Sequence, residues 1–405
     1  MERVETVIIG GGQAGLAMSY HLRRLGREHV IVERARVAER WRTQRWDSLM
    51  FQLPNWSISL PGQSYAGKDP DGFSHKDQIV KFLEDYCESI AAPLRTGVTV
   101  RSLRAASQAG QYMLVTDHGE LEARNVVIAT GPYQRPKTPQ LSSGFPVHVF
   151  QIHASEYRNP GALPTGPVLV VGAGASGCQI AEELLEAGRR VYLSVGRHRR
   201  VPRRYRGRDF IWWRRELGHL DQTAEATPKV RQMERLLLTG IHGGRDVNLR
   251  QLAARGMILL GRLRAIHESH IALDSDLEGN LRAGDQAYDE FKSDVDDYVT
   301  RMGIDAPRMP GDADQPRESQ ESIGEIDVRA SAISSVIWAT GYALDFRWVE
   351  LPIFDELGEP VHRRGITPVP GVYVLGLAWL HKRKSSFLFG VGEDAEYLAE
   401  RIHSA

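Results

Sequence analysis

The chain has 405 residues, more than a usual single domain, which predicts two domains with separate cores. Hydrophobic residues make up 42% and charged residues 25%, fractions that exclude a disordered or fibrous chain. Lys plus Arg and Asp plus Glu both number 51, so no overall field draws the protein toward nucleic acid or an anionic membrane.

Targeting and redox features predict a cytoplasmic protein. No apolar run approaches the about 18 to 20 residues that span a bilayer, and the first strand begins too early to leave room for a secretion signal. The two cysteines, Cys87 and Cys178, are far apart and form neither a C-x-x-C pair nor a metal-ligand set. We expect no bound metal, no nucleic acid and no membrane partner.

The first 33 residues predict a βαβ unit. Val4 to Ile9 is a β-branched strand, and apolar residues from Leu16 to Leu22 have the four-residue spacing of a helix that packs on a sheet. His29 to Glu33 is a second short strand. This order is typical of a doubly wound parallel sheet.

A glycine-rich turn joins the first strand to the helix. Gly10 permits the turn, Gly12 admits a pyrophosphate, and Gly15 lets the helix approach the strand. The helix N-terminus then faces the phosphates. Glu33 lies 18 residues after Gly15, where a carboxylate accepts hydrogen bonds from both ribose hydroxyls. The turn therefore predicts a dinucleotide whose adenosine carries no 2′-phosphate.

Between residues 78 and 131 the pattern changes to a helix followed by strands. Gln78 to Ile90 is predicted as a helix, and residues 98–105 and 112–116 as strands. A buried strand from Asn125 ends in Ala129-Thr130-Gly131, and a near copy of this ending recurs at Ala339-Thr340-Gly341. The repeat indicates two related folds.

The second fold repeats the first unit from residue 167 onward. A strand over 167–171, the turn Gly172-x-Gly174-x-x-Gly177, a helix over 179–187 and a strand over 191–195 follow in order. This time no acid ends the second strand. Arg197 stands there instead, which favours a 2′-phosphate and hence NADPH over NADH.

More arginines follow Arg197 and allow two interpretations. They form a basic patch that attracts an anionic dinucleotide, or they are solvated or paired with acidic residues of the following segment. The arginines are Arg199, Arg200, Arg203, Arg204, Arg206 and Arg208.

Residues 203–325 read as an insertion into the second fold. We predict a helix over Lys229 to Leu238, a hairpin around Glu268 and Ser269, and an amphipathic segment from Tyr288 to Met302. Residues 305–325 lack periodicity and predict a surface link. The amphipathic face packs on its own sheet or on a partner subunit, so a homodimer is one hypothesis.

The predicted fold class is α/β, with two nested Rossmann-like, doubly wound dinucleotide-binding domains and a mostly helical insertion. Residues 1–160 and 326–405 form the first domain. Residues 161–325 form the second, with the insertion at about 203–325.

The paired folds and the segment between them resemble the class B flavin-dependent monooxygenases. Their linker motif reads Phe-x-Gly-x-x-x-His-x-x-x-Phe/Tyr. His153 and Tyr157 fit it, whereas Val147 and Val149 stand in place of the Phe and Gly. The Tyr ending is closer to the plant auxin-forming and small bacterial flavin monooxygenases than to the Baeyer-Villiger branch. The resemblance covers roughly residues 1–200 and 330–400, and it implies FAD in the first domain and NADPH in the second.

Within the family the stretch after the first acid contacts the flavin, which implies a role for Arg40 and Trp41. Gln52 falls where relatives place an Asn or His, and its amide is the candidate catalytic group that stabilises charge as oxygen adds at C4a. The alternative is that the Gln52 amide has no catalytic role and only forms hydrogen bonds with neighbouring backbone groups. Three tryptophans either shield the flavin from water or belong to the core: Trp41, Trp46 and Trp56.

The C-terminal region supplies the second flavin contact. The strand from Gly371 ends in Gly376, and Leu377 follows where many disulfide reductases have an Asp. The glycines of Phe389-Gly390-Val391-Gly392 open the last helix, whose N-terminus either faces the flavin or is simple helix-start chemistry. His381 to Lys384 reads as a solvated basic turn. The predicted cofactor-binding residues are Gly10, Gly12, Gln13, Ala14, Gly15, Glu33, Arg40, Trp41, Gln52, Val100, Thr130, Gly131, Gly172, Gly174, Ser176, Gly177, Arg197, Ala339, Thr340, Gly341, Gly376 and Gly390.

The resemblance implies that NADPH reduces FAD and that a C4a-(hydro)peroxyflavin then oxygenates a small organic substrate with O2. N- or S-oxygenation and oxidative decarboxylation of a 2-oxo acid are the preferred reactions. The alternatives are an NAD(P)H-dependent quinone reductase or NADPH oxidase on the same fold, and a redox-sensing flavoprotein in which FAD is structural. A disulfide reductase is disfavoured because Cys87 and Cys178 are not a pair.

Overall fold

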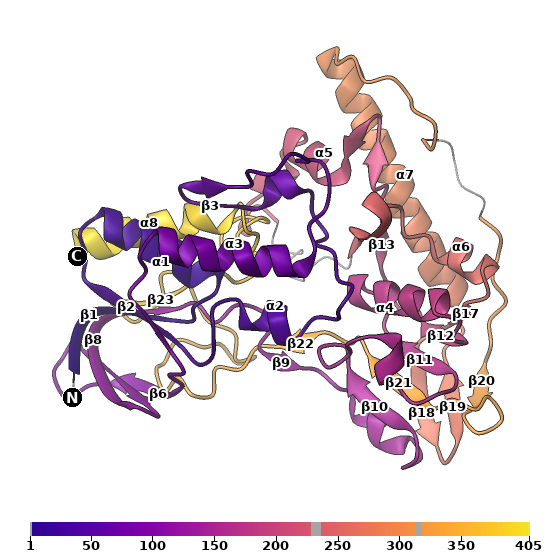
Figure 1. Ribbon diagram of the computed structural model, residues 1–405, viewed down its shortest axis with the longest axis horizontal. Helices are drawn as coiled ribbons and strands as arrows, with labels where there is room; N and C mark the ends of the chain where they lie inside the picture. Colours follow the sequence, from indigo (N-terminus) through magenta and orange to yellow (C-terminus); the bar gives the residue numbers. More distant parts are fainter. Residues whose placement is uncertain (1, 228–235, 313–316) are drawn as a thin grey trace.

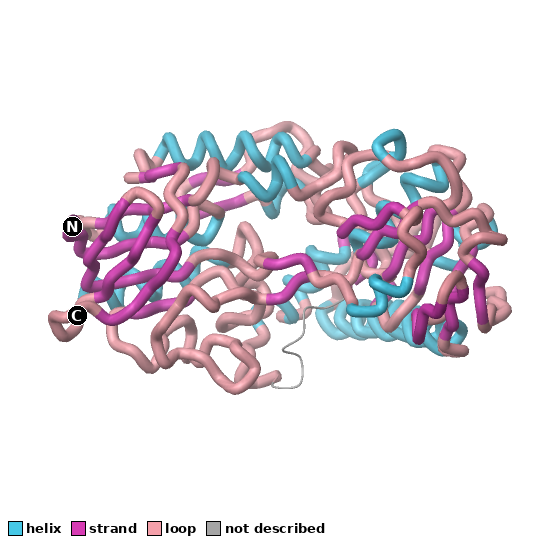
Figure 2. Tube along the Cα trace, turned by 90° about the horizontal axis from the view of Figure 1, so that it is seen from below, coloured by secondary structure: helices cyan, strands magenta, loops and turns pink. Residues whose placement is uncertain are grey.

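The computed structural model describes residues 2–227, 236–312 and 317–405. Figure 1 shows two lobes side by side, with both termini in the first. The chain passes from one lobe to the other along β9 (Arg135–Pro136) and returns along β22 (Tyr342–Ala343), and these two strands pair with each other. Figure 2 shows this two-stranded ladder between the lobes.

A seven-stranded sheet forms the first lobe, in the order β5-β2-β1-β8-β7-β6 with β23 paired to β8. The pairings of β5, β2, β1, β8 and β23 are parallel, and β6, β7 and β8 form an antiparallel meander. The strands are β1 (Glu2–Ile9), β2 (His29–Glu33), β5 (Leu94–Thr96), β6 (Val100–Ala105), β7 (Tyr112–Thr116), β8 (Gly119–Ile128) and β23 (Val372–Val374). The first βαβ unit is thus confirmed.

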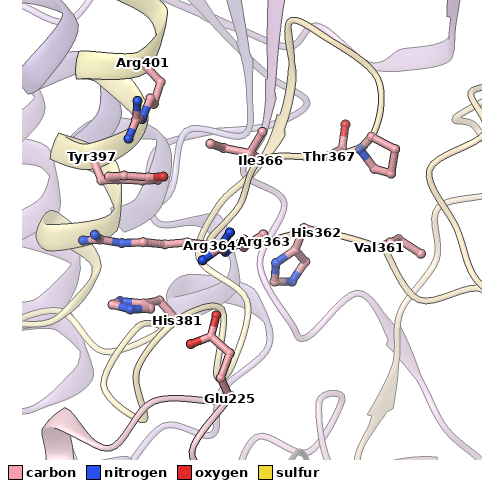
Figure 3. Close-up of a pocket in the computed structure, with 11 residues that line it drawn as sticks. Glu225, Val361, His362, Arg363, Arg364, Ile366, Thr367, His381, Tyr397 and Arg401 are labelled. Carbon is pink, nitrogen blue, oxygen red and sulfur yellow. The ribbon is translucent and has the colours of Figure 1, made fainter.

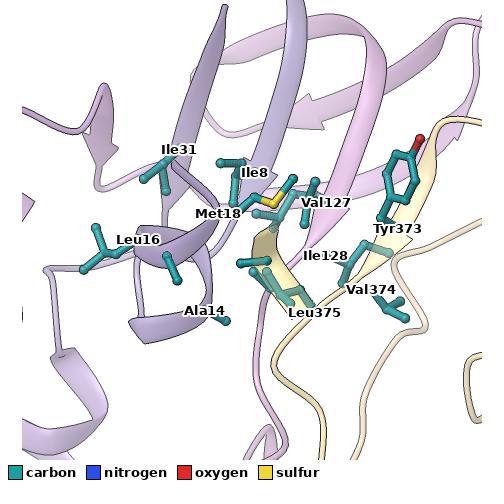
Figure 4. Packing of buried hydrophobic residues seen from close by; sticks show 14 of the residues in the cluster. Ile8, Ala14, Leu16, Met18, Ile31, Val127, Ile128, Tyr373, Val374 and Leu375 are labelled. Carbon is teal, nitrogen blue, oxygen red and sulfur yellow. The ribbon is translucent and has the colours of Figure 1, made fainter. Parts of the chain in front are cut away.

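The central strands of this sheet are buried on both faces, which accounts for their nearly continuous apolar sequences. Ile8 of β1 and Val127 of β8 are fully buried, as are Leu16 and Met18 of α1. Figure 4 shows these side chains packed together. The lobe also contains two short strands, β3 (Ser59–Leu60) and β4 (Gln63–Ser64), and four helices: α1 (Gln13–Arg24), α2 (Glu39–Thr43), α3 (Lys76–Ser89) and α8 (Val391–Ser404).

The second lobe contains a five-stranded parallel sheet in the order β10-β21-β11-β12-β17. Its strands are β10 (Phe150–His153), β21 (Ser335–Trp338), β11 (Val168–Val171), β12 (Val191–Ser194) and β17 (Ile258–Leu260). α4 (Ala175–Glu186) and α6 (Leu249–Ala254) contribute to the core on one face. The other face is covered by β18 (Leu263–His267), β19 (His270–Leu273) and β20 (Glu325–Asp327).

The sheet pairings place the lobe boundaries differently from the predicted limits of 161 and 325. β10 begins at Phe150 and β21 ends at Trp338, and both pair within the second sheet. The Ala339-Thr340-Gly341 ending therefore belongs to the second lobe, as Ala129-Thr130-Gly131 belongs to the first. Each lobe carries its own copy because each βαβ unit needs a third parallel strand beside its first strand.

The insertion is mixed rather than mostly helical. The predicted hairpin is confirmed as β18 and β19, with Glu268 at a positive φ of 56° in the turn. Of the predicted helix Lys229 to Leu238, residues 229–235 lie outside the described residues, while Leu236–Leu237 form β16, which pairs with β13. The remaining elements are β13 (Arg199–Arg200), β14 (Arg204–Tyr205), β15 (Arg208–Asp209), α5 (Phe210–Glu216) and α7 (Leu277–Met302).

The predicted amphipathic segment lies within the 26-residue helix α7. Phe291 and Val295 on its apolar face are buried against Phe210 and Trp213 of α5. This face is therefore covered by the chain itself. No helix in the described part of the chain is both long and apolar enough to cross a membrane.

Candidate dinucleotide-binding cleft

A cavity of 2120 Å³ lies where the two sheets present the carboxyl ends of their parallel strands. Both glycine-rich turns and both Ala-Thr-Gly endings line it, except for the third glycine of each turn. Of the predicted cofactor residues, all but Gly15, Gly177 and Gly390 contribute to its lining. The fold thus brings residues from distant parts of the sequence to one cleft.

The glycines of the first turn have two different roles: one packs against the protein backbone and another borders open space for a ligand. A Cβ added to Gly15 would lie 2.0 Å from the carbonyl oxygen of Gly10, whereas one added to Gly12 would meet nothing within 4 Å. Gly10 itself has a φ of 114°. Helix α1 has no side-chain N-cap and no acid in its first turn, so its free N–H groups suit a phosphate.

Glu33 is held at the end of β2 by two backbone N–H groups. Its Oε2 accepts a hydrogen bond from Gly11 N at 2.8 Å, and its Oε1 accepts one from Ala35 N at 3.0 Å. Each carboxylate oxygen can accept a further bond, and the side chain lines the cavity. These residues fit an adenosine with free ribose hydroxyls.

The second turn has the same construction. A Cβ on Gly177 would lie 1.8 Å from the carbonyl oxygen of Gly172, and one on Gly174 would meet nothing within 4 Å. Helix α4 likewise lacks a side-chain N-cap and an acid in its first turn. Arg197 lies three residues beyond the end of β12, exposed and on the cavity lining, and it forms no ion pair with any described residue. Its position suits a 2′-phosphate.

Three of the other arginines pair with acids, as the second interpretation of the basic patch expected. Arg200 lies 2.9 Å from Asp285, Arg203 lies 2.5 Å from Asp209, and Arg206 lies 2.7 Å from Asp296. These distances join guanidinium nitrogens to carboxylate oxygens. The three side chains stabilise the insertion and contribute little positive charge to the cleft.

The predicted flavin contacts lie on the first-lobe side of the cavity. Gln52 lines the cavity, and its backbone carbonyl accepts a hydrogen bond of 2.7 Å from Nη1 of Arg203. Arg40 donates to the carbonyls of Tyr133 and Gln134, and burial lowers its pKa to about 10. Its guanidinium is therefore charged at neutral pH.

The three tryptophans divide between the cavity and the protein interior. Trp41 lines the cavity with its ring centroid 5.9 Å from that of Phe51. Trp46 also lines it, and its buried Nε1 has no hydrogen-bond partner among the described residues. Trp56 does not belong to the described lining, because it packs against Phe389 at 6.0 Å. Shielding of the cavity therefore falls to Trp41 and Trp46.

Two cavity residues were missed from the sequence. Tyr133 and Tyr342 lie where the chain crosses between lobes, with ring centroids 5.2 Å apart, and the Arg45 guanidinium lies 5.5 Å from the Tyr133 centroid. Each tyrosine follows an Ala-Thr-Gly ending within two residues. That shared position was the pattern that would have found them. Gly390 was assigned to the cofactor, but its lack of a side chain instead allows close contact with the Lys384 carbonyl.

The linker histidine forms hydrogen bonds through both ring nitrogens. Nε2 of His153 donates to the Gly341 carbonyl at 3.0 Å, and its Nδ1 accepts from the Ser155 backbone N–H at 3.1 Å. Nδ1 also lies 2.9 Å from the Ser155 hydroxyl oxygen. Burial lowers the pKa of His153, although the bond to Gly341 acts in the opposite direction. Tyr157, the other motif residue, is buried and donates to Glu183.

His153 should make the fold sensitive to mild acid. Because its pKa is lower in the folded chain than the unfolded value of about 6.5, the unfolded chain takes up the proton first as the pH falls. The stabilisation is complete above about pH 6.5 and is lost below it. Urea unfolding at about pH 7.5 and 5.5 measures how much the free energy of unfolding falls between the two pH values. This fall should be larger for the wild type than for His153→Gln. Equal losses would contradict this assignment, since the other histidines are common to both proteins.

The cysteines offer no redox pair. Cys87 is half-buried on α3, Cys178 is buried on α4, and both are free. Burial raises the pKa of both thiols, which makes them poor nucleophiles. In the ranges that the structure describes, no group of three or more His, Cys, Asp or Glu side chains is arranged to hold a metal.

Two βαβ folds whose phosphate-binding turns face one cleft define a two-dinucleotide flavoprotein oxidoreductase. The family of pyridine nucleotide-disulphide oxidoreductases matches residues 7–208. Over 98% of its length, the chain is 34% identical to an uncharacterized CzcO-like oxidoreductase of Geobacillus kaustophilus, of which it covers 98%. The chain therefore belongs to the family of this CzcO-like oxidoreductase.

Part of the chain is also similar to flavin monooxygenases. The chain is 32% identical to indole-3-pyruvate monooxygenase YUCCA1 of Oryza sativa subsp. japonica, over 48% of this chain and 49% of that protein. The structure of a flavin-containing monooxygenase from Stenotrophomonas maltophilia superposes with a TM-score of 0.69 at 20% identity, covering 100% of this chain and 99% of that one. The chain is thus similar in sequence to a flavin monooxygenase over about half of its length, and similar in fold to one over all of it.

Proposed function

We propose that this enzyme uses NADPH and O2 to oxygenate a small organic substrate, by N- or S-oxygenation or by oxidative decarboxylation of a 2-oxo acid. The observation that carries the proposal is the single cleft onto which both dinucleotide turns open, without a cysteine pair at it. We assign FAD to the first lobe and NADPH to the second. When bound, FAD supplies the hydride acceptance and the oxygen chemistry.

The protein binds and orients the two dinucleotides. Glu33 accepts hydrogen bonds from the ribose hydroxyls of one adenosine. The N–H groups of Gly11 and Ala35 already hold its carboxylate in place before the ligand binds. The uncapped N-termini of α1 and α4 bind the two pyrophosphates. Arg197 pairs with the 2′-phosphate of NADPH.

Other residues exclude water and stabilise charge. Trp41 and Trp46 cover the cavity with apolar surface, and Trp46 has an Nε1–H still available as a donor. The amide of Gln52 donates hydrogen bonds toward negative charge that develops in the cleft. Arg203 fixes the Gln52 backbone and so holds that amide in position.

Replacing Arg197 by alanine should separate the two nicotinamide cofactors. Loss of one charge-assisted contact to the 2′-phosphate should weaken NADPH binding by about 1.5 to 3 kcal/mol and leave NADH almost unaffected. Titration of both cofactors by fluorescence or calorimetry measures this. Arg199→Ala is the matched control, because Arg199 is exposed nearby but does not line the cavity. Equal losses for both cofactors would remove Arg197 from this role.

The fate of O2 tests the proposed reaction. With NADPH, ¹⁸O2 and a panel of amines, thioethers and 2-oxo acids, we expect one class to yield a product that carries label or has lost CO2. NADPH consumption should then match product. Quantitative release of hydrogen peroxide with every compound, or fast reduction of quinones instead, would favour the NADPH oxidase or quinone reductase alternative.

A further inference from the structure

A second cavity, of 840 Å³, lies on the first lobe beside α8. Segment 361–368 and α8 form most of its wall, together with His381 and Glu225 (Figure 3). Three arginines line it: Arg363, Arg364 and Arg401. Among the described lining residues Glu225 is the only acid, so the pocket is basic.

Two of the three arginines, Arg364 and Arg401, lie against an aromatic ring. The Arg364 guanidinium carbon lies 4.1 Å from the centroid of Tyr397, and that of Arg401 lies 5.0 Å from the same centroid. Figure 3 shows Tyr397 between these two side chains. Arg364 also has a φ of 48°, a sparsely populated conformation that is found at ligand-binding sites. Guanidiniums fixed in this way bind an anion with little further loss of rotamer freedom.

Most of the positive charge in this pocket is not neutralised by the protein. Arg364 has a carboxylate partner, Asp394, at 3.4 Å, whereas Arg363 and Arg401 form no ion pair with the described residues. Asp394 also lies 3.8 Å from Nδ1 of His381, through its Oδ1, so this carboxylate faces Arg364 and His381 rather than the two outer arginines. The pocket therefore has guanidinium donors that an anionic ligand oxygen could bind.

The basic pocket continues into the dinucleotide cleft. Glu225, Val361, His362 and Arg364 line both cavities, while Arg363 and Arg401 line the outer one alone. A molecule whose charged end lies against the two outer arginines can therefore extend past Arg364 toward the cleft. The segment 376–380, after strand β23, lines the cleft at that side.

We propose that this basic pocket binds the anionic group of the substrate, a carboxylate or a phosphate, with the rest of the molecule reaching into the cleft. The proposal rests on the oxygenation function proposed above, because it places the substrate relative to that cleft. It restricts the substrate to small organic acids and phosphate esters.

Binding to the FAD-loaded enzyme tests the site independently of turnover. Calorimetric titration with 4-phenylbutyrate and with inorganic phosphate distinguishes the two anion sources. In Arg363→Gln/Arg401→Gln we expect the bound anion to lose affinity by about tenfold or more. Arg104→Gln, an exposed arginine of β6 outside both cavities, should bind like the wild type. Equal affinity in all three proteins, or no binding of either probe to the wild type, would overturn the proposal.

Steady-state kinetics tests whether the bound anion is the substrate. In the double variant the KM for acidic substrates should rise about tenfold or more, with kcat and the rate of flavin reduction by NADPH retained. A variant that changes kcat on neutral substrates and leaves the KM of acids unaltered would overturn the assignment to substrate. Loss of anion binding in the variant, with no oxygenated product from any acid, would uphold the anion site and count against the proposed oxygenation.

Discussion

Replacing Gly15 by alanine should prevent the first lobe from holding FAD. The added Cβ would lie 2.0 Å from the Gly10 carbonyl oxygen, a backbone atom that moves only if α1 separates from β1. Ordinary overpacking costs about 1 to 3 kcal/mol. A contact with backbone at this distance should cost at least about 3 kcal/mol, a large part of a typical total stability of about 5 to 15 kcal/mol.

Gly12→Ala is the matched control, because its Cβ would meet no protein atom within 4 Å. Gly12 has φ and ψ of −87° and −173°, which alanine also adopts. This variant should keep the wild-type stability in urea when stripped of cofactor, yet bind FAD more weakly, since its methyl group enters the ligand space. The flavin-to-protein ratio and the free energy of unfolding of both apoproteins measure the two effects. If the two variants behaved alike, the division between packing glycine and ligand glycine would be wrong.

Local patterns made much of this fold predictable. A strand, a glycine-rich turn and a helix follow one another within about 20 residues, so both βαβ units could be recognised before any long-range contact was known. Arg197 was assigned to the 2′-phosphate for the same reason, because it lies three residues beyond the end of its strand, and that role stays a prediction. Ala-Thr-Gly was recognised as a repeat, but its assignment to lobes needed the pairing of β21 with β10 and β11.

Contacts between distant segments explain what the sequence did not predict. The bond from Arg203 to the Gln52 carbonyl joins residues 151 positions apart, and no periodicity marks it. Trp41 and Trp56 looked equivalent in sequence, yet of the two only Trp41 lines the cavity, whereas Trp56 packs against Phe389, more than 300 positions away. The basic pocket likewise depends on how α8 packs beside segment 361–368.

Arg203→Met should cost about 3 to 5 kcal/mol of stability, because it leaves a buried carboxylate without its partner. Both Nε and Nη2 of Arg203 donate to Oδ2 of Asp209, at 2.9 and 2.5 Å, and the two residues are 1% and 7% exposed. Arg282→Met is the surface control. Its pair with Glu278 is solvent-exposed on the arginine side and should contribute about 0.5 kcal/mol or less. Urea unfolding of the two variants measures the difference.

A double variant separates the stability effect from the effect on the cleft. Asp209→Asn removes the buried charge but keeps an oxygen to cap α5 at Ile211 N, so Arg203→Met/Asp209→Asn should recover much of the lost stability. The Gln52 carbonyl still lacks its donor in that protein. We therefore expect the restored fold to waste NADPH as hydrogen peroxide in a larger proportion than the wild type. If the stable double variant consumed NADPH and formed oxygenated product in the same proportion as the wild type, Arg203 would support the insertion without positioning Gln52.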